Sequence, residues 1–239
     1  FHLFGGALGE VRSDVTIPIV PPAEAGEDAR RAAAEGFTDL KVKIGSGDQD
    51  FERTLAVARN APHAALRLDG NQGFRADEAV AFLKRVQDAG VQVALYEQPV
   101  HRSDLDGLRF VRERVAPVPV AADEAVLTPQ DAYRVARLGA ADVINVKLMK
   151  AGVLGALEII GVCRGAGIRL MLGCMLETRI GIGVAAHLAA GTGAFDFLDL
   201  DGHLLTGDAW TEGGFTQSGG RMALAEDVPG TGVEVVRMP

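Results

Sequence analysis

Three carboxylate residues follow short apolar runs at a nearly constant spacing. Asp69, Glu97 and Asp123 lie roughly 26 residues apart, close to one strand–helix unit of an α/β barrel. Three carboxylates brought together cannot all stay ionised without a cation nearby. Oxygen ligands without His or Cys suit Mg²⁺, with Mn²⁺ as the next choice. The spacing therefore predicts a divalent metal site at Asp69, Glu97 and Asp123.

Lysines stand at equivalent positions before and after these three carboxylates. Lys41 and Lys43 belong to the preceding apolar run, and Lys147 to the following one. A metal with a lysine on each side suits removal and return of a proton next to a carboxylate, because the metal stabilises the enolate while a lysine acts as base. We predict Lys43 and Lys147 as the acid/base pair. Lys41 supports them, because a second positive charge on the same strand face favours a neutral neighbouring amine.

A further pair of carboxylates, Asp199 and Asp201, ends the last predicted strand. Residues two apart on a strand share one face, so the two side chains could bind a cation together. The alternative is a polar strand end closed by Gly202 without a binding role.

Eight short runs rich in β-branched residues must position these side chains, and each is typical of a buried parallel strand. They are Val15–Val20, Leu40–Ile44, Ala65–Asp69, Val93–Glu97, Val118–Asp123, Val143–Lys147, Arg169–Gly173 and Phe195–Asp199. Helical patterns separate them at Glu24–Glu35, Asp50–Arg59, Ala76–Ala89, Asp104–Val115, Pro129–Leu138, Leu154–Ala166 and Glu177–Ala190. The regular spacing favours a TIM-type (β/α) barrel over a doubly wound sheet, and a barrel collects its chemistry at the C-terminal ends of its strands.

The composition limits the classes of partner. Against 32 Asp and Glu stand 24 Lys and Arg, a net charge of −8 without a long basic run. This argues against nucleic acid or an anionic membrane as the main partner. No apolar run reaches the ~18 residues of a membrane span, and the first ten residues show no secretion pattern. We therefore expect a cytoplasmic protein by default, with Cys163 and Cys174 as buried thiols.

Five motifs occur along the chain in one order: Lys-Val-Lys at 41–43, Leu-Asp-Gly-Asn-Gln at 68–72, Tyr-Glu-Gln-Pro at 96–99, Ala-Asp-Glu at 122–124 and Asn-Val-Lys-Leu at 145–148. With this set the sequence resembles the enolase superfamily, in its muconate-lactonizing-enzyme subgroup. The resemblance implies a modified (β/α)7β barrel that holds Mg²⁺ on the three carboxylates and uses the two lysines as acid and base. It also implies that Asn71 belongs to the same polar shell.

Two further stretches resemble the dipeptide epimerases of this subgroup, at 173–178 and 199–202. In that family an Asp-x-Asp pair binds the α-ammonium of a dipeptide. The resemblance therefore implies that Asp199 and Asp201, with Lys41 beside them, bind the substrate. The implied function is Mg²⁺-dependent epimerisation of the dipeptide's C-terminal residue through an enolate.

Other functions stay open. Within the subgroup, the alternatives are an N-succinylamino acid racemase, an o-succinylbenzoate synthase or a cycloisomerase. The lactonizing enzymes and the synthase take anionic substrates, which two carboxylates at 199 and 201 would repel. From another class, the chain could be a barrel that binds metal and ligand without catalysis.

The resemblance also sets the expected domain organisation. Family members carry an N-terminal α+β capping domain, which this chain lacks, so we expect the natural protein to be longer. Residues 1–12 are expected to be a remnant of the connection from cap to barrel, 13–203 the barrel, and 204–239 a C-terminal segment that packs on the barrel or the cap. Related barrels often associate, so a homo-oligomer is an alternative to a monomer.

Overall fold

The computed structural model describes residues 1–207, 210–226 and 228–236. Its centre is a ring of eight parallel strands that follow one another in sequence order. They are β2 (Val15–Ile17), β3 (Asp39–Lys43), β4 (Ala65–Asp69), β5 (Val93–Glu97), β6 (Val120–Ala122), β7 (Val143–Lys147), β8 (Arg169–Gly173) and β9 (Phe197–Asp199). A doubly wound sheet would reverse its strand order, so the sequential order confirms the predicted barrel.

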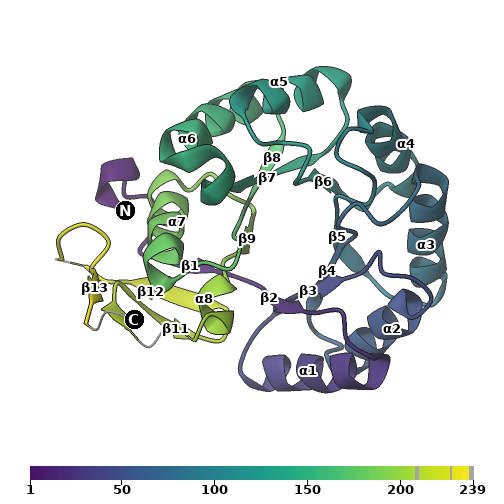
Figure 1. Cartoon of the computed structure of the whole chain (residues 1–239), viewed down its shortest axis with the longest axis horizontal. Coiled ribbons are helices and arrows are strands. Elements are labelled where there is room, and N and C mark those ends of the chain that lie inside the picture. The colour runs from purple at the N-terminus through teal and green to yellow at the C-terminus, as the bar shows by residue number, and fades with distance from the viewer. Residues whose placement is uncertain (208–209, 227, 237–239) are drawn as a thin grey trace.

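Helices form an outer layer around the strands (Figure 1). A helix follows each of the strands β2 to β8: α1 (Pro22–Ala34), α2 (Asp50–Asn60), α3 (Ala76–Asp88), α4 (Leu105–Val115), α5 (Pro129–Leu138), α6 (Leu148–Ala166) and α7 (Arg179–Thr192). The last strand leads instead into the short α8 (Gly202–Leu205). This is the expected (β/α)7β order.

Two strands and one helix differ from their predicted limits for local reasons. β2 ends at Ile17 because Pro18 has no N–H to continue the ladder, and β6 begins only after Pro119. α6 begins at Leu148, directly after β7, and is interrupted at Gly152, whose φ is 65°. The predicted start at Leu154 corresponds to the part of α6 beyond this break.

Alternation along β3 and β4 separates an apolar outer face from a charged inner face. Leu40 and Val42 of β3 and Leu66 and Leu68 of β4 pack with the large core between strands and helices. Residues next to them in sequence face the other way, into the ring. On β3 these are Lys41 and Lys43, and on β4 they are Arg67 and Asp69. The alternation therefore delivers charged side chains to the barrel interior.

The ring is joined less tightly between β9 and β2 than elsewhere. In the described residues no strand ladder links these two, whereas every other neighbouring pair has one. Three hydrogen bonds bridge the junction directly: Asp14 N donates to Leu198 O at 3.1 Å, Leu200 N donates to Ser13 Oγ at 2.7 Å, and Thr16 N donates to Asp201 Oδ2 at 2.7 Å. Arg67 crosses it from inside, donating to Leu198 O at 2.7 Å and to Asp14 Oδ2 at 2.8 Å. We call this junction, residues 13–17 against 197–201, the seam.

Both ends of the chain contribute to small antiparallel sheets beside the barrel. β1 (Glu10–Arg12) pairs with β12 (Arg221–Leu224), which also pairs with β11 (Phe215–Ser218). β10 (Thr211–Gly213) pairs with β13 (Val233–Val235). Strands of both sheets contact α7. In the part of the chain that the structure describes, no helix has the length and apolar content needed to cross a bilayer.

The seam supports a stability prediction. Arg67→Met is expected to lower the free energy of unfolding by about 3–5 kcal/mol, because it leaves the fully buried Asp14 without its charge partner. Urea unfolding followed by circular dichroism measures the change. Arg30→Met is the control, since Arg30 forms an exposed pair with Glu27 worth at most about 1 kcal/mol. Equal losses in the two variants would contradict a structural role for the seam.

Candidate active site

The three carboxylates predicted to hold a metal all lie at the carboxyl end of the ring, although among the described residues their oxygens do not all lie within 4.8 Å of one another. Asp69 and Glu97 end β4 and β5 and are paired in register, while Asp123 directly follows β6. All three side chains are buried. Asn145 Nδ2 donates to Glu97 Oε1 at 2.7 Å. The sheet thus concentrates three acidic groups where water is nearly excluded.

Lysine ammonium groups balance these carboxylates. Lys41 Nζ lies 3.0 Å from Asp69 Oδ2 and 2.9 Å from Glu97 Oε2. Lys43 Nζ lies 2.6 Å from Asp69 Oδ2 and donates to Asn71 Oδ1 at 2.8 Å.

Lys147 approaches from another part of the ring, with Nζ 2.8 Å from Asp123 Oδ2. In the strand order, β3 and β7 lie across the ring from each other. Lys43 and Lys147 therefore approach the carboxylates from opposite sides of the ring.

The pKa shifts show how strongly these charges depend on one another. Burial, followed by the charge of Asp69, raises the pKa of Glu97 to about 7. Burial alone would raise the pKa of Asp123, but Lys150 and Lys147 hold it below its usual range. Burial would lower the pKa of Lys147, but Asp123 raises it above the usual value. A cation that takes up the charge of Asp123 would therefore favour the neutral amine of Lys147.

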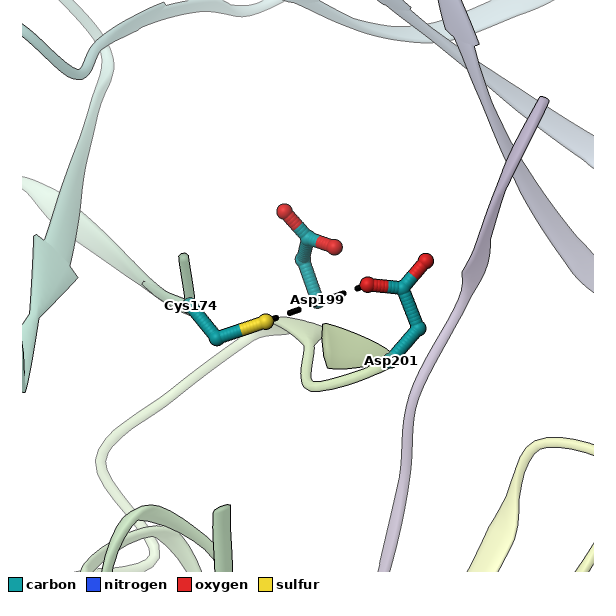
Figure 2. A group of neighbouring side chains, drawn as sticks. All are labelled: Cys174, Asp199 and Asp201. Atoms are coloured by element: carbon teal, nitrogen blue, oxygen red, sulfur yellow. Dashed lines mark hydrogen bonds between the residues drawn. The ribbon is translucent and has the colours of Figure 1, made fainter. Parts of the chain in front are cut away.

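Asp199 and Asp201 form a second anionic group beside the first. Figure 2 shows the Asp199 and Asp201 carboxylates and the Cys174 thiol beside one another. One ligand atom from each of the three lies within 4.8 Å of the other two. Lys41 Nζ donates to Asp199 Oδ2 at 2.7 Å, and Thr16 N donates to Asp201 Oδ2 at 2.7 Å. The nearest donor to Asp201 Oδ1 is the weak Cys174 thiol at 3.8 Å. Asp201 therefore keeps one carboxylate oxygen suited to a cationic ligand.

One cavity is lined by Asp123 of the first group and by the second group. Its lining includes all three predicted lysines, both aspartates of the 199–201 pair and the apolar side chains Met175, Leu176 and Leu205. Gly173, at the end of β8, leaves room for the side chains of Asn145 and Lys147. A Cβ at this position would lie 2.7 Å from Asn145 Oδ1 and 3.0 Å from Lys147 Cε. Such a side chain would push Lys147 from its place.

Some residues of the site were not predicted. Lys150 donates to Asp123 Oδ1 at 2.7 Å and to Asp123 O at 2.8 Å. Its position one helical turn after Lys147 was a signal available in the sequence. Gln98, fully buried, accepts from Asp123 N at 2.9 Å and from Ala125 N at 3.1 Å. The sequence pattern gives no hint of this contact, because it depends on how β5 and β6 are aligned.

The carboxylates fit a hard divalent cation. Glu97 Oε2 is buried and has no hydrogen-bond donor among the described residues, although Lys41 Nζ lies 2.9 Å away. The Lys41 ammonium beside it is shared with Asp69 and Asp199, so a further cation would stabilise this buried oxygen. Asp69, Glu97 and Asp123 supply oxygen donors alone, which is the ligand set that Mg²⁺ prefers.

A family model described as "Enolase C-terminal domain-like" matches residues 24–238. The chain belongs to this family. It is 39% identical over 226 residues to the L-Ala-D/L-Glu epimerase of Thermotoga maritima, covering 94% of this chain and 65% of that protein. Among the curated relatives, the chain spans less than two thirds of the length of this epimerase and of two others that it matches.

Solved structures of this enolase-like family agree with the barrel. A substrate-liganded complex of the L-Ala-D/L-Glu epimerase of Bacillus subtilis superposes with a TM-score of 0.95 at 36% identity, covering 99% of this chain and 67% of that one. The dipeptide epimerase of Enterococcus faecalis V583, complexed with Mg and the dipeptide L-Leu-L-Tyr, superposes with a TM-score of 0.92 at 38% identity. That match covers 97% of this chain and 66% of that one.

The carboxylate geometry predicts a metal-dependent gain in stability. Adding MgCl₂ at a hundred times its dissociation constant is expected to stabilise the folded protein by about 2.7 kcal/mol, seen as a rise in melting temperature. Glu97→Gln should abolish this rise, because an amide cannot replace the carboxylate charge. The control Glu212→Gln changes an exposed residue of β10 and should keep the rise. A full rise in the Glu97 variant would exclude Glu97 as a ligand.

Proposed function

We propose that this chain forms the barrel of a Mg²⁺-dependent dipeptide epimerase. The observation that carries the proposal is the position of Lys43 and Lys147 on opposite sides of three buried carboxylates, with Asp199 and Asp201 next to them. Two bases on opposite faces suit inversion at one carbon, since one removes a proton and the other returns one.

The relatives support this choice within the family. Proteins named as dipeptide epimerases match nearly the whole chain, and one solved neighbour holds both Mg and a dipeptide. A substrate with a free ammonium fits the pair at 199 and 201, whereas an N-acylated amino acid has no positive charge to offer there. We therefore favour a dipeptide over the substrates of a racemase or a cycloisomerase.

Asp69, Glu97 and Asp123 would hold the Mg²⁺. When bound, the metal supplies positive charge that stabilises an enolate next to the substrate carboxylate. Mn²⁺ would also suit this ligand set. Lys41, which already pairs with Asp199, lies between the two anionic groups and balances both.

The proton transfers follow from the lysine positions. The neutral amine of one lysine takes the α-proton of the C-terminal residue, and the electrons of the C–H bond pass into the enolate. The ammonium of the opposite lysine then gives a proton to the other face of the same carbon. Lys43 and Lys147 exchange these roles according to the configuration of the substrate.

We also propose a cytoplasmic site of action. The free thiols of Cys163 and Cys174, both buried, agree with a reducing compartment.

The two-base mechanism predicts distinct losses. Lys43→Ala and Lys147→Ala should each reduce epimerisation by at least ~10²-fold, because each removes one proton carrier. Each variant should still exchange the α-proton of one epimer with solvent. Proton NMR of L-Ala-L-Glu, L-Leu-L-Tyr and their C-terminal D-epimers in D₂O with MgCl₂, using the natural protein, measures both. Full epimerisation by either variant would refute the mechanism.

Recognition of the ammonium can be tested separately. Asp201→Asn should lower kcat/KM for a dipeptide about 10- to 100-fold, because a charged hydrogen bond is worth ~1.5–3 kcal/mol. Turnover of an N-succinylamino acid, which has no ammonium, should not fall. Asp106→Asn, an exposed change in α4, is the control. If both substrates lost activity equally, Asp201 would not be an ammonium ligand.

A further inference from the structure

The side chain of Asn71 lies between Lys43, which needs a hydrogen-bond acceptor, and Glu124, which needs a donor. Its Oδ1 accepts from Lys43 Nζ at 2.8 Å, and its Nδ2 donates to Glu124 Oε1 at 3.1 Å. A carboxylate offers no donor, and an ammonium offers no acceptor. A reversed amide would face Lys43 with its NH₂ group and Glu124 with its oxygen, which is unfavourable on both sides. Glu124 therefore fixes the direction of the Asn71 oxygen.

Both ends of this chain of contacts are anchored. Asn71 N donates to Asp69 Oδ1 at 3.0 Å, and the φ of Asn71 is 41°, in the left-handed region. The turn that carries Glu124 is held by the Gln98 side chain, which accepts from the backbone N–H groups on either side of Glu124. Because the backbone is fixed at both places, the Glu124 carboxylate meets the Asn71 amide in one arrangement.

Asn71 gives Lys43 a hydrogen-bond acceptor that it can keep after its amine gains or loses a proton. An amide oxygen accepts an N–H from an ammonium and from a neutral amine alike. The other partner of Lys43 is Asp69 Oδ2, an oxygen of a carboxylate assigned here to the metal. Asn71 Oδ1 is therefore the neutral acceptor that can hold Lys43 Nζ in both protonation states.

Lys147 is held by different contacts. Its Nζ pairs with Asp123, whose carboxylate and carbonyl are both fixed by Lys150. Asp123 also keeps its backbone contact with Gln98. Shortening the Glu124 side chain leaves all of these contacts in place.

We propose that Glu124 is a positioning residue for Lys43, acting through the Asn71 amide and serving one face of the substrate. This rests on the two-lysine function proposed above. Disturbing Glu124 should therefore slow proton transfer on the Lys43 face and spare the Lys147 face. A residue that merely supports the fold would affect both faces alike.

The test measures α-proton exchange of each epimer separately, by proton NMR in D₂O with MgCl₂. The loss seen in Lys43→Ala identifies the epimer that Lys43 serves. Glu124→Ala should slow exchange of that same epimer about 10- to 100-fold, the usual cost of losing a supporting contact in a site. Exchange of the other epimer should stay within about twofold.

Two matched variants guard against trivial explanations. Glu124→Gln keeps an oxygen that can accept from Asn71 Nδ2, so it should restore most of the lost exchange. Asn71→Gly removes the amide but tolerates the left-handed φ, so it should reproduce the one-sided loss even if Glu124→Ala fails to fold. The melting temperature and its rise with MgCl₂ should stay close to those of the unaltered protein in Glu124→Gln.

The outcomes separate this inference from the function beneath it. If the unaltered protein exchanges neither epimer of any dipeptide, the proposed function fails. If it exchanges both, but the Glu124 and Asn71 variants slow both epimers equally or neither, the positioning role is overturned. Failure of Glu124→Gln to restore exchange would also overturn it, because the negative charge and not the acceptor would then matter.

Discussion

The structure depends on balancing a group of carboxylates that are buried at one end of the barrel. Asp69, Glu97 and Asp123 cannot all be ionised there without positive charge nearby, and burial, followed by the charge of Asp69, raises the pKa of Glu97 although Lys41 and Lys147 oppose the rise. A further cation beside these carboxylates would favour their ionised forms. The same charge balance also ties acid/base chemistry to metal binding, because Lys147 is held protonated by the carboxylate that a metal would engage.

The barrel keeps this charge arrangement from collapsing. Apolar side chains on the outer faces of β3 and β4 pack under the helices, which fixes the direction of the charged residues between them. Continuous ladders from β2 to β9 set the heights of the strand ends relative to one another. As a result, Lys43 and Lys147 are held apart. Among the three carboxylates, Asp123 lines the cavity, while Asp69 and Glu97 are buried away from its described lining.

Much of this arrangement follows from the sequence, since a constant spacing of strand ends places Asp69, Glu97 and Asp123 at one mouth. The constant spacing along the sequence could not reveal contacts that depend on how neighbouring strands are aligned. Gln98 and Glu124 belong to this class, because their partners come from other strands. The pattern also overlooked the prolines that shorten β2 and β6. The apolar run extends past the end of β2, and it starts before the beginning of β6.

The weak junction of the ring has an evolutionary consequence. Asp199 and Asp201 lie on one side of the seam and Thr16, which binds Asp201, lies on the other. The metal carboxylates and the two bases lie on strands joined by full ladders. Changes in the 199–201 pair therefore disturb few backbone hydrogen bonds, while changes among the bases or the metal carboxylates disturb the most ordered part of the sheet. Under the proposed function, such a barrel can diverge in which substrate it accepts while its proton chemistry stays the same.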